Sequence, residues 1–275
     1  MRNVATKAPL GILAGAGKMP LMAAKTVRAA GRPVVAVQFA ETGQKKLGRY
    51  CDQCVTLSVG HAGAMLDYFT QHGVKEILLI GKVDKQLNFA DIEFDAAALT
   101  MLARLPDRQD SSLFGVIADE LKSRGMRVAK QTIILADLLV PEGHLAGPTP
   151  GDKVARDIAL GFEVATAVAG YDIGQAVAVK AGTVIAVEAF EHTDACVRRA
   201  GKLAGRGLTV CKVSRPKQDP RFDVPTIGPS TISTLARVGA TALAVEAGAV
   251  LLLEPEKVYA AADAHAISLV GVSQS

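Results

Sequence analysis

The residues best suited to chemistry lie in residues 212–232, which read KVSRPKQDPRFDVPTIGPSTI. Each of the prolines fixes φ near about −65° and lacks a backbone donor, so we expect a stiff loop rather than a strand or helix. Polar and charged side chains of both signs alternate between the prolines: Arg215, Lys217, Gln218, Asp219, Arg221 and Asp223.

The loop then leads into an apolar periodic run that opens with Gly228-Pro229-Ser230-Thr231, which predicts a helix start. A basic loop that leads into a helix N-terminus is a candidate anion-binding site, because free N–H groups and the positive dipole end face it. An ordinary surface loop with solvated charges is the competing interpretation, and composition alone leaves both open.

A second group of polar residues is predicted at the open end of a hairpin. Residues 174–190 read GQAVAVKAGTVIAVEAF, which indicates two strands around a turn at Ala181-Gly182. With a two-residue loop, Lys180 faces Thr183 and, counting outward, Gln175 faces Glu188. This register places Gln175 beside Glu188 at the end of the ribbon.

Two more acids follow that hairpin directly, Glu191 and Asp194, and we expect them at the same corner. Thr193 lies between them as the expected N-cap of a helix that runs to Leu203. On these residues alone, capping and surface salt bridges are the favoured explanation of the acids. Cys196 lies in this helix, but no His or Asp pattern supports it as a nucleophile.

A glycine-rich turn lies near the start of the chain. Residues 10–14 are expected to form a strand and residues 20–30 a helix, with Gly15-Ala16-Gly17 between them. Pro20 stands where a dinucleotide-binding fingerprint has its third glycine, so a tight packing turn explains the pattern better than NAD binding. Backbone N–H groups near a phosphate or a uridine stay open as a role.

Strand and helix signals alternate through both halves, which predicts two α/β domains, the N-terminal one Rossmann-like. Residues 141–151, PEGHLAGPTPG, are dense in Pro and Gly and are expected to join the halves. We therefore expect an N-terminal domain over 1–142, a linker over 143–151 and a C-terminal domain over 152–275.

Composition narrows the class of protein. The 275 residues are 49% hydrophobic but only 4% aromatic, which suits Ala/Val/Leu/Ile cores between helices and sheets. The net charge of +4 is mild and no nucleic-acid type of Lys/Arg cluster is present. Cys51 and Cys54 form a CxxC without a second pair at zinc-site spacing, so a reduced cytoplasmic setting is expected. The most apolar later run, 240–253, contains Glu246 and is too short to span a bilayer.

Two long motifs resemble the LpxI family of UDP-2,3-diacylglucosamine pyrophosphatases. They are KxxxPxQDxRFDxPTIGxxTI at 212–232 and DIGQAVAVKAGTVIAVEAFEHTDACVRRAG at 172–201. GILAGAGKMP at 11–20, IGKV at 80–83 and the helix near 110–121 are also similar. The resemblance spans nearly the whole chain.

The resemblance implies a cytoplasmic enzyme of lipid A biosynthesis in Gram-negative bacteria. It would split UDP-2,3-diacylglucosamine into UMP and 2,3-diacylglucosamine 1-phosphate (lipid X), with Mg²⁺ or another divalent cation. Peripheral contact with the inner membrane is expected and a nucleic-acid partner is not. Formation of a homo-oligomer is left open.

The resemblance also implies roles for particular residues. The family's essential aspartate falls on Asp223, and the expected catalytic residues are Asp223, Asp219, Lys212 and Arg221. Expected metal ligands are Asp223, Glu188 and Glu191, since Mg²⁺ prefers oxygen and binds few carboxylates plus substrate phosphates. Expected substrate-binding residues are Gly15, Gly17, Lys82, Gln175, Gln218, Thr226, Gly228, Ser230 and Thr231.

Two other classes of protein are compatible with parts of the pattern. A non-catalytic regulator could bind a nucleotide or lipid with the same glycine turn and basic loop, and it would not release UMP. An NAD(P)-dependent enzyme would need the fingerprint that Pro20 interrupts. His61, His144 and His192 receive no role, because lone histidines in loops are usually solvated.

Overall fold

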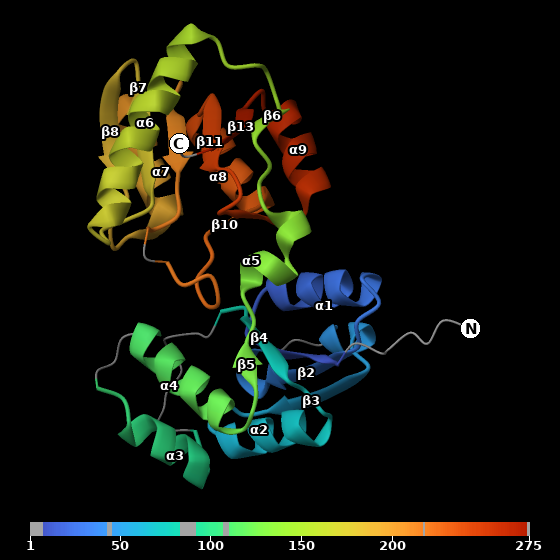
Figure 1. The fold of residues 1–275 in the computed structure, drawn as a ribbon. Helices are drawn as coiled ribbons and strands as arrows, with labels where there is room; N and C mark the ends of the chain where they lie inside the picture. Colours follow the sequence, from blue (N-terminus) through green and yellow to red (C-terminus); the bar gives the residue numbers. More distant parts are fainter. Residues whose placement is uncertain (1–7, 43–45, 83–91, 107–109, 217, 274–275) are drawn as a thin grey trace. The chain divides into compact units, whose positions relative to one another are not determined.

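The protein consists of two compact units, Met1–Leu135 and Ala136–Ser275, each built on its own sheet (Figure 1). The computed structural model describes residues 8–42, 46–82, 92–106, 110–216 and 218–273. The two α/β domains expected from the alternating strand and helix signals are confirmed.

The first unit contains a five-stranded sheet in the order β3-β2-β1-β4-β5, and all of its strand pairs are parallel. This order, with β1 central, confirms the Rossmann-like prediction. The strands are β1 (Leu10–Ala14), β2 (Val34–Phe39), β3 (Gln53–Leu57), β4 (Glu76–Ile80) and β5 (Arg127–Val128). The helices are α1 (Met19–Ala29), α2 (Ala62–Gln71), α3 (Ala96–Ala103), α4 (Asp110–Ser123) and α5 (Gln131–Ile134), with 3₁₀ turns at Ala40–Thr42 and Leu47–Tyr50.

The second unit contains a six-stranded mixed sheet in the order β6-β13-β11-β9-β7-β8. Its strands are β6 (Gly143–Ala146), β7 (Ala176–Lys180), β8 (Thr183–Val187), β9 (Thr209–Lys212), β11 (Ala242–Glu246) and β13 (Ser268–Val272). A separate parallel pair joins β10 (Thr226–Ile227) to β12 (Leu251–Leu252). The helices are α6 (Asp152–Gly170), α7 (His192–Ala204), α8 (Pro229–Val238) and α9 (Pro255–Ala264), after a 3₁₀ turn at Ala136–Leu138.

Helices cover both faces of this second sheet (Figure 1). On one face α6 packs through Ile158 and Phe162 against Val177 and Cys211. On the other face α7, α8 and α9 pack over the remaining core. The apolar side chains alternate along each strand, as the two-residue period of a strand requires. The helix α6 lies very close to the sheet, since a Cβ at Gly161 would be 2.4 Å from the Cys211 sulfur.

The segment that the sequence predicts to be a linker, 143–151, contains a strand in the structure. The chain divides earlier, between Leu135 and Ala136. Residues 143–146, expected in the linker, form the edge strand β6, which pairs antiparallel with β13. The Pro and Gly signals therefore mark the turns on either side of a very short strand, and four residues are too few to show a strand pattern.

The expected hairpin register is correct only near its turn. Lys180 pairs with Thr183, as predicted, but a bulge shifts the register beyond Val179. Glu188 consequently stands opposite Ala176 rather than Gln175, and its N–H donates to the Ala176 carbonyl at 2.8 Å. An extra residue in one strand has this effect, and no strong sequence signal marks it here.

Candidate active site

Residues of the two long motifs, 172–201 and 212–232, meet at one edge of the second sheet. Lys212 ends β9 and pairs with Ala176, which begins β7, and with Val245 near the end of β11. The end of β8 lies beside them, since Val187 pairs with Val177. The loop that follows β9, described at 213–216 and 218–225 and orange in Figure 1, leaves the sheet at this edge. Carboxyl ends of parallel strands are the usual ligand-binding edge of α/β sheets.

A hydrogen-bonded chain connects a buried acid to a lysine at this edge. Glu188 is only 8% exposed, and its Oε1 accepts from the Thr193 hydroxyl at 3.0 Å. The same hydroxyl accepts from Lys212 Nζ at 3.2 Å. Glu188 Oε2 accepts from the Gln175 N–H at 3.4 Å. The chain fixes the Lys212 ammonium next to the loop and balances the buried carboxylate.

Thr193 is therefore not the helix N-cap expected from the sequence. α7 begins at His192 with Glu191 in the N-cap position, and no side chain caps it. The Thr193 hydroxyl donates to Glu188 instead of accepting from the helix backbone. Gln175 and Glu188 do lie together, as expected, although the bulge changed which backbone groups face each other.

The loop is held to this edge by Gln218 and Arg215. Gln218 Oε1 accepts from Gln175 Nε2 at 3.4 Å and from the Arg215 N–H at 3.0 Å. Arg215 forms ion pairs with Asp172 at 2.9 Å and with Asp223 at 3.9 Å. The Gln218 Nε2 atom is buried and has no hydrogen-bond acceptor among the described residues. A buried amide donor of this kind is costly unless a ligand or water satisfies it.

Within the loop, Asp219 and Arg221 form a close pair. Arg221 Nε donates to Asp219 Oδ1 at 2.9 Å and its Nη2 donates to Oδ2 at 2.6 Å. The Arg221 N–H also donates to Asp219 Oδ1 at 2.9 Å, which closes a local turn. The hydrogen bonds to Asp219 raise the pKa of Arg221. Asp219 thus shapes the loop, whereas the Asp223 side chain is 67% exposed.

The loop ends at the start of α8, where the expected helix signal is confirmed. Gly228 occupies the N-cap and Pro229 the first turn, and the Gly228 N–H donates to the Thr231 hydroxyl at 3.3 Å. Lys212 Nζ reaches this region as well, since it donates to the Thr226 carbonyl at 3.4 Å. The exposed Ser230 lies in the first turn of the helix.

The three carboxylates expected to bind metal have different surroundings. Glu191 pairs with Arg199, and this hydrogen bond lowers the pKa of Glu191. Both oxygens of Glu188 accept hydrogen bonds within the protein. Within the described ranges, no three or more His, Cys, Asp or Glu side chains are grouped to hold a metal ion. Asp223 is the most exposed of the three carboxylates.

Three of the expected substrate-binding residues lie together in the first unit. The Ala16 N–H donates to the Lys82 carbonyl at 2.6 Å, and the Lys82 N–H donates to the Ala16 carbonyl at 3.0 Å. A Cβ at Gly15 would lie 2.6 Å from the Lys82 carbonyl oxygen, so this approach requires glycine. Gly17 has a φ of +97°. The turn lies where β1 and β4 end, again the usual ligand edge of a parallel sheet.

Sequence reasoning missed Arg215 and Glu246 as members of the site. Glu246 Oε2 accepts from the Ser214 N–H at 2.6 Å and from its hydroxyl at 2.8 Å, which holds the start of the loop. The sequence does contain one signal for Glu246, because it is an acid at the carboxyl end of the apolar strand ALAVE, and this end of a parallel strand is where ligand-binding residues are usually found. Arg215 carried no signal beyond its charge.

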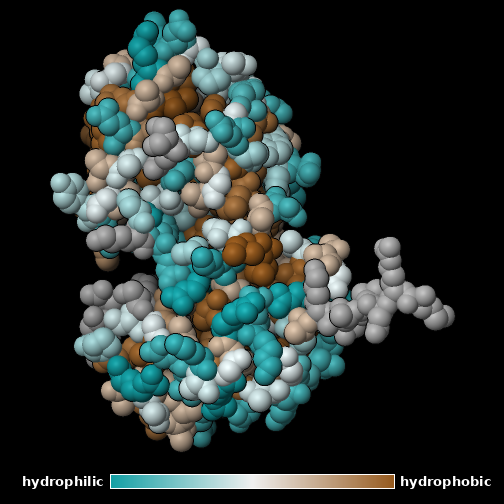
Figure 2. All heavy atoms as spheres, in the orientation of Figure 1, coloured by the Kyte–Doolittle hydropathy of each residue, from teal (hydrophilic) through white to brown (hydrophobic). Residues whose placement is uncertain are grey.

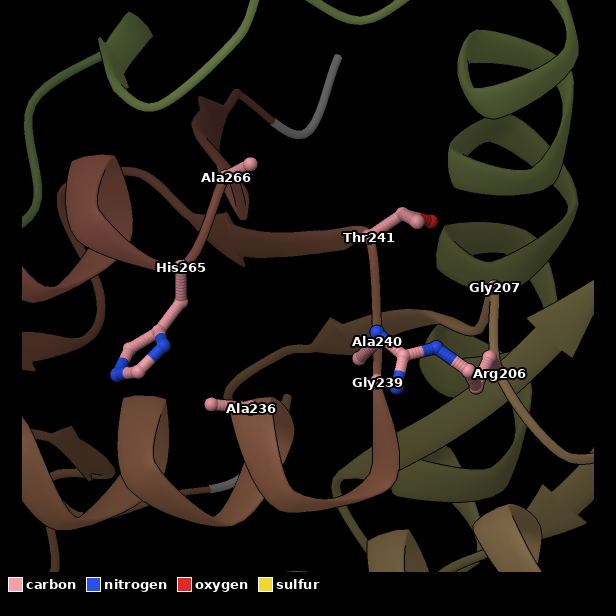
Figure 3. A pocket seen from close by; sticks show the side chains of 8 residues that line it. All are labelled: Arg206, Gly207, Ala236, Gly239, Ala240, Thr241, His265 and Ala266. Carbon is pink, nitrogen blue, oxygen red and sulfur yellow. The ribbon is translucent and has the colours of Figure 1, made fainter.

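Two other features lie apart from this chemistry. Cys196 is buried, which raises the pKa of its thiol to about 11, so it is no activated nucleophile. A cavity of about 450 Å³ lies at the opposite edge of the sheet, because its lining residues precede β9, β11 and β13 (Figure 3). Its walls are Arg206, Gly207, Ala236, Gly239, Ala240, Thr241, His265 and Ala266.

The fold is that of a two-domain α/β protein in which a charged loop leads into a helix start at the carboxyl ends of the second sheet's parallel strands. Sequence models of the LpxI N-terminal domain and the LpxI C-terminal domain match residues 9–138 and 141–270. The chain belongs to the LpxI family. It is 32% identical over 274 residues to the UDP-2,3-diacylglucosamine pyrophosphatase LpxI of Caulobacter vibrioides, covering 96% of this chain and 97% of that protein.

Similarity to solved structures is remote. The biotin carboxylase domain of Hydrogenobacter thermophilus 2-oxoglutarate carboxylase is 12% identical over 74% of this chain and 37% of its own, with a TM-score of 0.27. Campylobacter jejuni biotin carboxylase is 17% identical over 73% of this chain and 43% of its own, with a TM-score of 0.26. The chain thus spans less than half of either structure. TM-scores this low do not establish a common fold.

Proposed function

We propose that the protein hydrolyses the pyrophosphate of UDP-2,3-diacylglucosamine to UMP and 2,3-diacylglucosamine 1-phosphate in lipid A biosynthesis. Its membership of the LpxI family, and the relative from Caulobacter vibrioides that carries this activity in its name, support the reaction. The observation that carries the proposal is the buried Gln218 amide beside the cations of the loop, whose Nε2 has no acceptor among the residues that the structure describes. A phosphate oxygen would satisfy it.

The cations of the loop have a direct role in this proposal. A pyrophosphate carries negative charge on both phosphorus atoms, and cleavage adds charge to the leaving oxygen. Lys212, Arg215 and Arg221 supply positive charge for these oxygens, with the first-turn N–H group of Ser230. Lys212 is fixed by Thr193 and so needs little reorganisation when the substrate binds.

Asp223 is the proposed catalytic carboxylate. Its side chain is exposed at this edge and lies 3.9 Å from the Arg215 guanidinium. It can therefore accept a proton from, or orient, the attacking water. Asp219 is committed to Arg221 and is proposed to position that guanidinium and the loop.

The family implies a divalent cation, and the residues at this edge fit one loosely held hard ion. Mg²⁺ commonly binds one or two carboxylates together with substrate phosphates and keeps several waters. Asp223 would hold it, because its oxygens are exposed while those of Glu188 are hydrogen-bonded within the protein. When bound, the ion would neutralise phosphate charge.

The glycine turn of the first unit is proposed to contribute to nucleotide binding. Gly15 and Gly17 follow β1, and Lys82 follows β4 at the same place. The Gly15 N–H donates to the Ile80 carbonyl and the Ala16 N–H to the Lys82 carbonyl, so the exposed Lys82 side chain is the group proposed to contact the UMP portion.

The proposed place of action is the cytoplasmic face of the inner membrane, where a substrate with two acyl chains resides. No helix in the described ranges has the length and apolar sequence to cross a bilayer.

Release of UMP from UDP-2,3-diacylglucosamine, with and without EDTA, tests the function. The proposal predicts release with Mg²⁺ and its loss with EDTA. Tight substrate binding without release would instead support the regulator, the second class compatible with the sequence. UMP release that persists in EDTA would contradict only the proposed requirement for a metal ion.

A further inference from the structure

Three exposed apolar residues lie beside the candidate site. Phe190 is 97% exposed, Tyr171 81% and Ile173 52%. Scattered exposed apolar residues are normal, and Figure 2 shows several among hydrophilic ones. These three, called here the apolar patch, differ because they belong to two adjoining turns. The other large exposed hydrophobic residue in the described part of the second unit is Leu203, in the last turn of α7.

Close backbone contact joins the two turns of the apolar patch. Tyr171 and Ile173 follow α6, and Phe190 follows β8. A Cβ at Gly174 would lie 1.9 Å from the Glu188 carbonyl oxygen, so the turns lie directly against each other. Only glycine permits this approach.

The apolar patch is also tied to the loop of the candidate site. Asp172, between the two patch residues that follow α6, forms an ion pair with Arg215 at 2.9 Å. Gln175, two residues after Ile173, donates to Gln218 of the loop. Any surface that receives the apolar patch therefore lies next to the proposed phosphate site.

We propose that the apolar patch inserts into the lipid–water interface of a phospholipid bilayer and holds the site at the surface that contains the substrate. Aromatic side chains favour the interfacial region of a bilayer, and exposed loop residues can enter it without unfolding. This inference rests on the proposed function, because a substrate with two acyl chains must be drawn from a lipid phase.

The size of the apolar patch favours a bilayer over a second copy of the chain. A large side chain buries at most about 150–250 Å². Three partly buried side chains thus contribute less than the roughly 800 Å² per partner of a standard stable interface. A bilayer has no such minimum, since each inserted side chain adds to partitioning independently.

The test uses the full chain and vesicles of phosphatidylethanolamine and phosphatidylglycerol in a flotation assay without substrate. The variants are Phe190→Ser and the triple variant that combines Tyr171→Ser, Ile173→Ser and Phe190→Ser. Leu203→Ser is the matched control, because Leu203 is 66% exposed and lies in the same unit. It is roughly 16 Å along α7 from the helix start. Circular dichroism checks that each variant is folded.

Phe190→Ser is expected to weaken vesicle binding about tenfold, equivalent to about 1.4 kcal/mol. The triple variant should lose binding by at least about a hundredfold, and Leu203→Ser should bind like the unmodified protein. Unchanged vesicle binding by the triple variant would overturn the inference. So would a change from oligomer to monomer in light scattering with vesicle binding retained, since the patch would then contact a second copy.

Turnover separates this inference from the proposed function. The ratio of UMP release from vesicle-embedded substrate to release from detergent-dispersed substrate should fall in the triple variant and stay constant in Leu203→Ser. An equal ratio in all three proteins would contradict the inference. Absence of UMP release by the unmodified protein in detergent would refute the function instead, while the flotation result would still decide the role of the patch.

Discussion

Replacing Glu188 by glutamine tests whether this acid serves the architecture of the site. Glu188 is 8% exposed and accepts hydrogen bonds from Thr193 and from the Gln175 N–H. Glutamine keeps one acceptor oxygen but turns an NH₂ donor toward one of these donors. The Lys212 ammonium also loses the negative charge of Glu188, to which it is linked through the Thr193 hydroxyl. Hydrogen bonds to charged groups contribute about 1.5–3 kcal/mol each, so we expect a loss near 2 kcal/mol.

A thermal melt of the full chain measures this loss. About 2 kcal/mol corresponds to a Tm lower by roughly 4–8 °C. Glu191→Gln is the matched control, because Glu191 lies on the same turn but is more exposed, with hydrogen bonds from Arg199 and from the Ala189 N–H at 3.2 Å, and its melt should change less. An unchanged Tm for Glu188→Gln, or an equal loss in the control, would refute this role. A loss that EDTA reproduces in the unmodified protein would make Glu188 a metal ligand instead.

Two further predictions concern other parts of the chain. Burial alone would raise the pKa of Glu76, but Arg32 and Arg127 outweigh it and lower the pKa. Stabilisation by an acid of lowered pKa is present above its unfolded pKa and is lost as pH falls through the folded value. Glu76→Gln should therefore cost about 1 kcal/mol of unfolding free energy at pH 7 and progressively less in acid, and a pH-independent difference in urea melts would contradict this. Cys196→Ala should retain UMP release, because burial raises the pKa of that thiol to about 11. Loss of UMP release in a folded Cys196→Ala variant would indicate instead that Cys196 acts as a nucleophile.

Much of the fold could be predicted from local patterns. The strand expected at 10–14 is an apolar run, as buried parallel strands are, and it matches β1 of the structure. Pro229 begins α8 where the turn signals placed a helix start. These signals are strong because each depends on neighbouring residues alone.

Features that depend on long-range pairing escaped prediction. The bulge beyond Val179 changes which residue faces Glu188, and it results from packing of the whole ribbon. The strand β6 exists because β13, far along the chain, offers a free edge to residues 143–146. Neither partner can be identified from periodicity.

The sequence predicted which residues belong to the site better than it predicted how they are bonded to one another. Lys212, Gln175, Glu188 and Gln218 do form one connected group. Their connection runs through Thr193, which the sequence suggested only as a helix cap. Choosing between capping and bonding to Glu188 requires the positions of both strands, and these come from tertiary structure.

The most direct test of the account compares UMP release by Asp223→Asn and Asp219→Asn with that of the unmodified protein. Both changes remove one charge from the same loop, but only Asp223 is assigned to the reacting atoms, while Asp219 is bonded to Arg221. Asp223→Asn should lower kcat by about 10²–10⁴-fold, with substrate binding retained and the fold intact. Asp219→Asn should lower it less. Near-normal release by Asp223→Asn, together with its loss in Asp219→Asn, would show that the catalytic carboxylate has been assigned to the wrong residue.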